Sequence, residues 1–268
     1  MDAVNEPLAR HAVDVADRHI RGEGTPERVW QAWGGLAALA PLALDALAPT
    51  SSRVVIVAPH PDDEVLGCGG ALALMARHAR DLLVIGVTDG EAGYPGSLRW
   101  TPGLLARRRR DECRMGLERL GLAGGLVSLG IPDGAIGAAQ DDLAAAVADR
   151  LRPGDVVLTT WRHDGHPDHE AAGRAAVLAA RTRGCACWEM PIWMWHWARP
   201  DDARVPWSRL RRLNLDEEAA ERKCRAIAAH ASQIEPIPSE QRDPVLPHWA
   251  LARLLRTFET FIDSGSAE

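Results

Sequence analysis

One short loop of this chain concentrates groups that can bind a metal or move a proton. After a β-branched run at 54–57, residues 58–64 read Ala-Pro-His-Pro-Asp-Asp-Glu, with one imidazole and three carboxylates in the last five positions. Charge of that density at the end of a buried strand costs free energy unless something binds it, and a divalent cation would do so. His60 and Asp63 lie three positions apart, so one turn of a loop can direct both at one point.

A second loop further along the chain has the same character. Residues 161–170 read Trp-Arg-His-Asp-Gly-His-Pro-Asp-His-Glu, which places three histidines and two aspartates within the seven residues 163–169. A single histidine is more often an ordinary surface or core residue than a ligand. Two such clusters, each directly after a predicted strand, indicate one shared site.

Two imidazoles and one carboxylate, with a coordination position left open, form a catalytic zinc site. We therefore expect the metal ligands to be His60, Asp63 and His169. Zn²⁺ is the expected metal, and Fe²⁺ is compatible with the same ligands. The metal would lower the pKa of its water molecule and polarise a substrate carbonyl.

Three neighbouring residues can act beside the metal. Asp62 is free to serve as general base on the water. His166 can stabilise the developing oxyanion or protonate the leaving amine. Asp168 would orient a histidine of the site and stabilise its charge.

The elements that must position these loops alternate between strands and helices. Short apolar runs predict strands at 54–57, 82–87, 126–129 and 156–160, and amphipathic segments predict helices at 65–79, 104–120, 139–151 and 168–182. This alternation predicts a parallel sheet covered on both faces. Since ligands bind beyond the carboxyl ends of such strands, both loops stand where a site is expected.

The remaining segments are less regular. Residues 1–50 predict helices in two pieces, 185–213 an irregular segment, and 214–262 two helices joined by a Pro-rich loop at 235–247. The tryptophans at 188, 193, 195 and 197 favour core packing or an oligomer contact over stacking on a sugar.

Several charged neighbours of the two loops allow two interpretations. Glu64 either assists the site or opens the following helix. His163 and Asp164 either line the mouth of the site or belong to a solvated loop, and Glu91 is better explained as a solvated loop residue.

The motifs resemble those of a known family. Pro59 to Glu64 and His166 to His169 resemble the paired signatures of the LmbE-like, or PIG-L-type, zinc-dependent N-acetylglucosaminyl deacetylases. Weaker resemblances follow in order: 88–91 to a T-x-G-E loop, 109–112 to an R-x-x-E helix, 129–134 to an L-G-x-x-D-G turn, and Lys223, His230, Ser232 and Gln233 to a late K…H-x-S-Q element. The resemblance covers roughly residues 53–235.

The resemblance implies a Rossmann-like α/β fold and hydrolysis of an N-acetyl group on an amino sugar or its conjugate. It implies the same three ligands and the same base. Arg109 matches a substrate-contacting arginine, although Arg108 and Arg110 are alternatives in register, and Asp133 matches a sugar-contacting aspartate. The N-terminal segment has no counterpart in the resemblance, and from its own pattern we expect a helical extension at 1–52, packed on a deacetylase domain at 53–268 that ends in helices.

Composition narrows the context. A net charge of -6 and a pI of about 5.9 give no basic footprint for nucleic acid. The five cysteines suggest free thiols in a reducing cytosol. The most apolar segment, 34–48, is too short and interrupted to span a membrane. We expect a cytoplasmic enzyme with a small-molecule amino-sugar substrate, and the oligomeric state stays open.

Three other functions are compatible with parts of this pattern. Two histidines and a carboxylate also describe the facial triad of non-haem iron oxygenases. A sugar- or nucleotide-binding module would explain the glycines at 67–70, which lack the spacing of a phosphate loop. An amide hydrolase with a non-sugar substrate would use the same water and base. The additional acid and base candidates favour hydrolysis.

Overall fold

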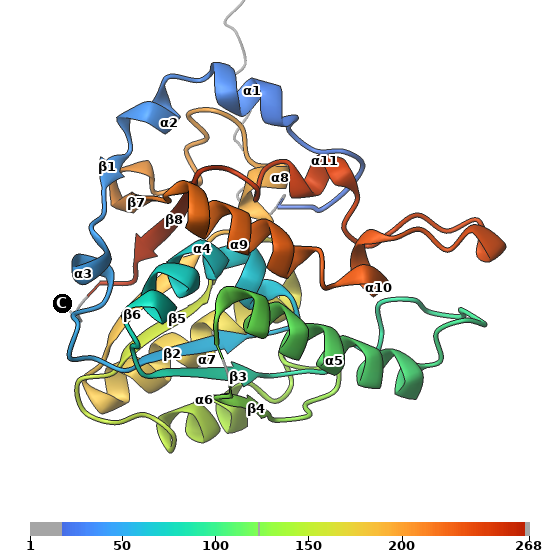
Figure 1. Cartoon of the computed structure of the whole chain (residues 1–268), viewed down its shortest axis with the longest axis horizontal. Coiled ribbons are helices and arrows are strands. Elements are labelled where there is room, and N and C mark those ends of the chain that lie inside the picture. The colour runs from blue at the N-terminus through green and yellow to red at the C-terminus, as the bar shows by residue number, and fades with distance from the viewer. Residues whose placement is uncertain (1–17, 123, 266–268) are drawn as a thin grey trace, which may run out of the picture.

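A single mixed sheet lies at the centre of the computed structural model, which describes residues 18–122 and 124–265 (Figure 1). Across these residues the sheet has eight strands in the order β1-β7-β8-β6-β5-β2-β3-β4. The bounds are β1 Ala40–Pro41, β2 Val54–Ala58, β3 Leu82–Gly86, β4 Leu126–Ser128, β5 Val156–Thr160, β6 Ala186–Met190, β7 Leu210–Asn214 and β8 Phe258–Asp263. Only β8 runs antiparallel to its two neighbours, β6 and β7.

Helices cover both faces of the sheet. One face carries α4 (Asp63–Arg77), α5 (Pro102–Leu120) and α9 (Glu217–Ile227), and the other carries α6 (Gln140–Ala148) and α7 (Pro167–Arg183). Alternate residues of β2 belong to different cores: Val54 and Ile56 face the first layer, and Val55 and Val57 the second. All five residues of β2 are buried, which explains its unbroken apolar sequence.

The predicted α/β fold is confirmed, and the four predicted strands and the helices between them are present with small changes at their ends. The prediction for 185–213 was wrong, because this segment contains β6 and β7. The second helix predicted for 214–262 is replaced by short turns and β8. These turns are α10 (Ala231–Ile234), η2 (Pro238–Glu240) and α11 (His248–Leu251).

A buried carboxylate in each of β6 and β8 interrupts the apolar run that would predict a strand, which explains why neither strand was predicted from the sequence. Glu189 is the fourth of the five residues of β6 and pairs with Arg162 at 2.6 Å. Glu259 stands in β8 and pairs with Lys223 at 2.8 Å. Each carboxylate is satisfied by a cation from a distant segment, and such a partner cannot be read from the local sequence.

The first described residues run along one edge of the sheet, where β1 is the outermost strand. They form α1 (Glu27–Ala32), α2 (Gly35–Ala38), β1 and α3 (Leu44–Leu47), and β1 pairs with β7. The helices predicted before residue 18 lie outside the described residues. Trp30 of α1 meets Trp195 of α8 (Met194–Trp197) with ring centroids 5.0 Å apart, and its Nε1 donates to the Trp195 carbonyl at 3.0 Å.

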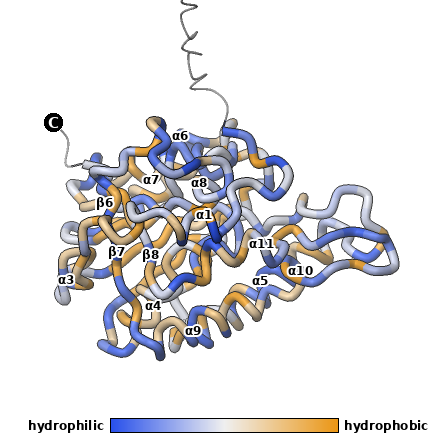
Figure 2. The backbone as a smooth tube through the Cα atoms, turned by 90° about the horizontal axis from the view of Figure 1, so that it is seen from above, coloured by the Kyte–Doolittle hydropathy of each residue, from blue (hydrophilic) through white to orange (hydrophobic). Residues whose placement is uncertain are grey.

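Tryptophans therefore join the N-terminal segment to the main core, and the preference for core packing of this Trp-rich segment is confirmed. Trp207, in η1 (Trp207–Arg209), completes this aromatic cluster. Figure 2 shows hydrophobic and hydrophilic residues interspersed in the region of β6, β7 and β8. No helix among the described residues is both long and apolar enough to cross a bilayer.

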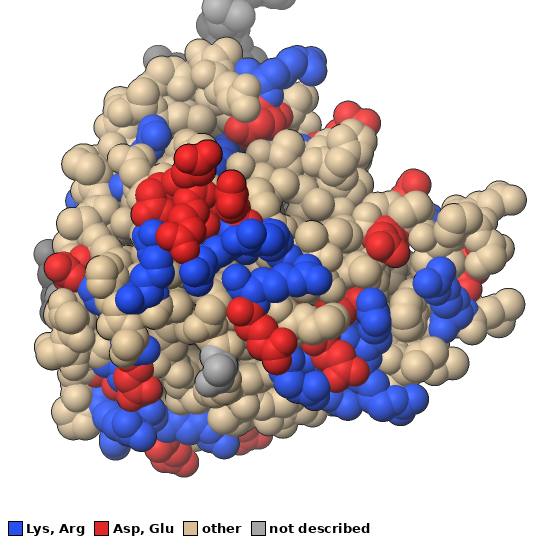
Figure 3. Space-filling model, in the orientation of Figure 1, with Lys and Arg blue, Asp and Glu red and all other residues tan. Residues whose placement is uncertain are grey.

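Exposed charge on the surface is mixed in sign. Figure 3 shows basic and acidic side chains next to one another on the face that carries α4 and α9. There Arg77 pairs with Asp216 and Glu218, and Arg222 pairs with Glu218. Such exposed pairs contribute little to stability.

Removal of the Trp30 ring tests how tightly the N-terminal segment is integrated. Trp30 has no exposed surface, so we expect Trp30→Ala to lower the free energy of unfolding by about 3–5 kcal/mol. The free energy of unfolding is measured by urea denaturation, followed by tryptophan fluorescence and circular dichroism. Leu98→Ala is the control, because Leu98 is 92% exposed and should change stability by less than about 0.5 kcal/mol. Equal, small effects would show that the segment packs without stabilising the core.

Candidate metal centre and its surroundings

The loop that follows β2 turns sharply and buries its polar side chains. Asp63 Oδ2 accepts the His60 N–H at 2.9 Å and lies 3.3 Å from the Nδ1 atom of the same residue. The loop leads directly into α4, which begins at Asp63. The His60 side chain is 10% exposed and that of Asp63 is 3% exposed, so both are held in place by the surrounding protein.

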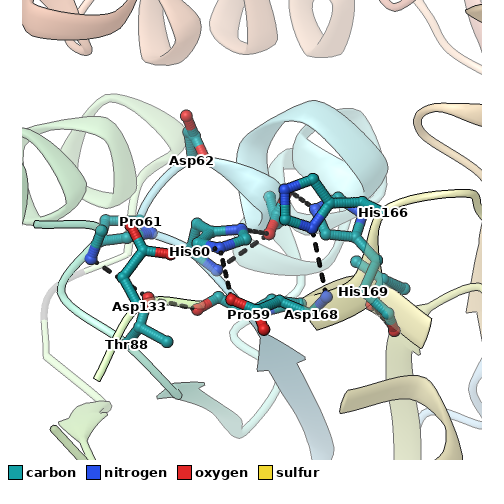
Figure 4. A network of polar contacts seen from close by, with 12 residues as sticks. Pro59, His60, Pro61, Asp62, Thr88, Asp133, His166, Asp168 and His169 are labelled. Atoms are coloured by element: carbon teal, nitrogen blue, oxygen red, sulfur yellow. Dashed lines mark hydrogen bonds and ion pairs between the residues drawn. The ribbon is translucent and has the colours of Figure 1, made fainter. Parts of the chain in front are cut away.

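The loop that follows β5 brings the second cluster to the same place (Figure 4). His169, in the first turn of α7, has its Nε2 atom 3.3 Å from Asp63 Oδ1. The two oxygens of Asp63 therefore contact two different histidines. The His166 ring lies 4.8 Å from that of His169 and 5.0 Å from that of His60, measured between centroids.

Two aspartates contact His60 on its other side. Its Nε2 atom lies 3.1 Å from Asp133 Oδ1 and 3.3 Å from Asp168 Oδ2. Asp168 also accepts the Gly134 N–H at 2.8 Å. The turn after β4 is thus attached to the start of α7, and Asp133 is directed at a histidine.

Glu91 has a more definite position than a solvated loop residue would have. Its carboxylate accepts the Asp133 N–H at 2.9 Å, and Asp133 in turn accepts the Ala92 N–H at 3.0 Å. Glu91 is half-buried. The expectation of a solvated side chain was wrong, because the loop after β3 folds over the turn after β4 and uses this carboxylate to fix it.

The donor atoms suit a divalent cation. Nitrogen and oxygen donors of two triplets lie within 4.8 Å of one another: His60, His166 and His169, and His60, Asp133 and Asp168. Asp63 joins the two histidines of the expected ligand set through contacts at 3.3 Å. Imidazole nitrogens and carboxylate oxygens are the donors that zinc takes in such sites.

The electrostatics of the cluster also favour a cation. Burial alone would lower the pKa of His60, but hydrogen bonds to Asp133, Asp168 and Asp63 raise this pKa well above its usual value. Burial alone would raise the pKa of Asp63, but the imidazoles of His169 and His60 hold this pKa below its usual value. The carboxylates thus draw positive charge into the cluster.

Asp62 has a strained backbone and an arginine partner. Its φ and ψ are 152° and -24°, a region that non-glycine residues rarely occupy and that is typical of functional sites. Glu64 accepts the Asp62 N–H at 3.1 Å, so the structure supports its role as a partner of this loop. Burial raises the pKa of Asp62 to about 6 against the opposing effect of Arg109.

The Asp62 carboxylate points away from His60 in Figure 4. Its Oδ2 atom contacts Arg109 Nη2 at 3.1 Å. Catalytic hydrogen bonds are often loose before substrate binds, so this position is compatible with a base that turns toward the cluster when the site is loaded.

Of the three arginines in question, only Arg109 reaches this centre. It is buried, and it donates to the carbonyl oxygens of Gly90 and Pro61 at 3.0 and 3.3 Å. Arg108 instead pairs with Glu112, and Arg110 pairs with Asp89. The helical spacing of α5 separates the three directions.

Asp164 contributes to the centre in a way that sequence reasoning left undecided. Its Oδ2 atom lies 2.8 Å from His169 Nδ1, and its two oxygens accept the N–H groups of Ile192, Trp193 and Met194 at 2.9–3.0 Å. Asp164 therefore fixes the ring of His169 and joins it to the Trp-rich segment. His163 packs edge-on against Trp161 instead. The position of Asp164 five residues before His169 was the available signal, but its backbone partners were not visible.

His166 has a defined protonation pattern. It precedes α7, and its Nδ1 atom accepts the Asp168 N–H at 3.3 Å. A neutral imidazole that accepts at Nδ1 carries its proton on Nε2. Burial lowers the pKa of His166 to about 3, so the ring is a neutral N–H donor.

Comparisons with known proteins identify a family and several similar deacetylases. Residues 55–180 match the sequence profile of the family described as GlcNAc-PI de-N-acetylase, PIG-L. The chain is 33% identical over 147 residues to 2'-N-acetylparomamine deacetylase of Streptomyces fradiae, a match that covers 47% of this chain and 52% of that protein. It thus spans about half the length of this relative.

Two further similarities cover more of the compared protein. An uncharacterized deacetylase of Escherichia coli (strain K12) is 30% identical over 136 residues, with 48% of this chain and 68% of that protein covered. The crystal structure of the antimicrobial reagent A40926 pseudoaglycone deacetylase is similar with a TM-score of 0.56 and 27% identity. That match covers 81% of this chain and 99% of the other.

Neutralising Asp164 should weaken metal binding. We expect Asp164→Asn to reduce Zn²⁺ affinity about 10–100-fold, since a carboxylate that orients a ligand histidine contributes that much in other metal sites. Competition with a chromophoric chelator measures the affinity, and circular dichroism verifies the fold. Asp142→Asn, on the exposed start of α6, is the matched control. Unchanged affinity in both variants would contradict the role given to Asp164.

Proposed function

The chain belongs to the GlcNAc-PI de-N-acetylase (PIG-L) family, and on this premise we propose that it is a metal-dependent hydrolase. It removes the N-acetyl group from an N-acetylglucosamine-type amino sugar or its conjugate. The observation that carries the proposal is the contact of Asp63 with both His60 and His169, beside a neutral His166. The named relatives act on 2'-N-acetylparomamine and on the A40926 pseudoaglycone, which supports an N-acylated sugar or glycoconjugate as substrate.

We assign His60, Asp63 and His169 as the metal ligands and Zn²⁺ as the metal, with Fe²⁺ as the alternative. A divalent cation bound there would lower the pKa of a water molecule and polarise the amide carbonyl. Asp133 and Asp168 hold the His60 ring from the other side, and Asp164 holds the His169 ring. These contacts keep the two imidazoles in fixed orientations.

Asp62 acts as the general base. Asp62 is the neighbour of the ligand Asp63 in the sequence, and its carboxylate, now paired with Arg109 at 3.1 Å, would turn toward the cluster when substrate binds. A pKa raised to about 6 lets this group accept a proton from water and pass it on near neutral pH. The proton then goes to the amine nitrogen as the carbon–nitrogen bond breaks.

His166 acts on the oxyanion. Because its Nδ1 atom accepts the Asp168 N–H, its Nε2–H is the donor available to a substrate. A fixed neutral donor stabilises negative charge that develops on the carbonyl oxygen. Of the two roles expected from the sequence, this geometry favours oxyanion stabilisation over protonation of the amine.

Asp133 is the better candidate of the two expected sugar contacts. Its side chain is 11% exposed, whereas that of Arg109 is 5% exposed and is directed at Asp62. We therefore propose that Asp133 binds a sugar hydroxyl and that Arg109 positions the base, Asp62.

The cellular compartment follows from the cysteines. All five are free thiols, which supports the reducing cytoplasm.

Asp62→Ala should separate metal binding from catalysis. In zinc-loaded protein we expect kcat to fall about 10²–10⁴-fold, the usual contribution of a general base, while one Zn²⁺ per chain stays bound. The assay is release of free amine from N-acetylglucosamine, its glycosides, sugar nucleotides and acetylated peptides. Asp142→Ala serves as control. Equal rates in wild type and Asp62→Ala would remove Asp62 from the mechanism, and activity on the peptides alone would replace the sugar by a non-sugar amide.

His166→Ala should lower kcat about 10²–10³-fold with little change in KM, because an oxyanion donor acts mainly in the transition state. Steady-state kinetics on the best substrate from the panel provides both constants. His163→Ala is the matched control, since His163 contacts Trp161 and lies outside the cluster. A rise in KM with kcat unchanged would instead assign His166 to ground-state binding.

A further inference from the structure

The helix that begins at Asp63 is broken after its first turn. At Cys68 the backbone has φ -141° and ψ 19°, which lies outside the helical region. The segment from Asp63 to Ala73 is buried, so backbone groups at the break cannot be satisfied by bulk water and need protein partners.

A buried ion pair supplies those partners. Glu259 of β8 accepts the N–H of Gly70 at 2.7 Å and of Ala71 at 2.8 Å. The Lys223 Nζ atom, from α9, donates to the Leu66 carbonyl at 2.9 Å and to Glu259 at 2.8 Å. The two side chains are only 3% and 1% exposed.

The pair is placed inside the hydrogen-bond ladder of α4. In an unbroken helix, the N–H of Gly70 would donate to the carbonyl of Leu66, four residues earlier. Here each of these two groups has a charged partner from outside the helix. Side chains that enter the ladder in this way are a recognised cause of helix kinks.

Small residues at the break allow the close approach. A Cβ atom on Gly69 would lie 3.3 Å from Lys223 Cγ, and one on Gly70 would lie 2.3 Å from Leu215 Cδ1. Figure 1 shows α9 alongside α4, with β8 next to them. The glycines at 69 and 70 thus let α9 and the residues before it reach the break.

We propose that Lys223 and Glu259 are positioning residues for the metal centre. Their ion pair holds the break in α4 and so fixes the direction of the short segment 63–67, which is too short to be stable on its own. Asp63 opens this segment and Asp62 precedes it. The inference rests on the proposed function in one respect, since it takes Asp63 as a ligand and Asp62 as the base.

The test removes both charges together. Loss of one partner would leave an unpaired buried charge and endanger folding, whereas apolar replacement of both leaves no buried charge and costs only the neutral hydrogen bonds to Leu66, Gly70 and Ala71. The variant is Lys223→Met with Glu259→Met. The matched control is Arg53→Met with Asp155→Met, because that pair is also largely buried and lies before β2 and β5, at the opposite ends of these strands from the centre.

Three measurements follow on folded, full-length protein. We expect faster amide hydrogen exchange at 64–72 in the Lys223/Glu259 variant, Zn²⁺ affinity reduced about 10–100-fold as for other groups that orient ligands, and a lower kcat with KM little changed. The control should lose thermal stability while keeping wild-type affinity and exchange at 64–72. A Lys223/Glu259 variant that behaves like the control in all three measurements would overturn the inference.

Failure of the proposed function gives a different result. Wild type that binds Zn²⁺ but releases no amine would refute the deacetylase assignment, and metal affinity would still decide the role of the ion pair. Wild type that binds no Zn²⁺ would refute the metal centre, and hydrogen exchange at 64–72 would then decide whether the pair holds the start of α4.

Discussion

Buried carboxylate charge at the carboxyl end of β2 is the constraint on which the rest of this structure depends. Asp63, Asp133 and Asp168 all contact His60 in a region largely closed to water. Such a group is stable only when each oxygen has a donor. Backbone N–H groups of His60, Ala92 and Gly134 supply several of these donors, so the loops must hold their shapes for the charge to be tolerated.

The strand order explains why these loops meet. From β2 the chain moves outward to β3 and β4, and then returns to place β5 on the other side of β2. The centre therefore lies where the order of the sheet reverses, which is the usual position for a ligand site in open α/β sheets. Loops after β2, β4 and β5 contribute the imidazoles and carboxylates, and the loop after β3 fixes the turn that carries Asp133.

The sequence alone predicted those strands and loops whose structure depends on neighbouring residues in the chain. The apolar runs of β2 and β5 and the two charged loops identified the fold and the residues that the structure brings together. Arg109 could not be selected within its run of arginines, because the choice depends on which face of α5 meets Asp62. Asp164 and Glu91 act through backbone groups of other loops, and no side-chain pattern encodes such partners. The strands β6 and β8 were not predicted because Glu189 and Glu259 interrupt their apolar runs. The cations that neutralise these carboxylates, Arg162 and Lys223, come from distant segments.

The position of β8 has a consequence for how the molecule is made. This strand follows every other strand in the sequence, yet it is inserted between β6 and β7, and β1 is attached to the sheet only through β7. A ribosome delivers the chain from its N-terminus, so the sheet cannot close while β8 is still being synthesised. Until then the edges of β6 and β7 are unpaired, a state that favours association between nascent chains. Glu259, which β8 carries, therefore reaches Lys223 and the backbone of α4 only after every other described strand of the sheet has been synthesised.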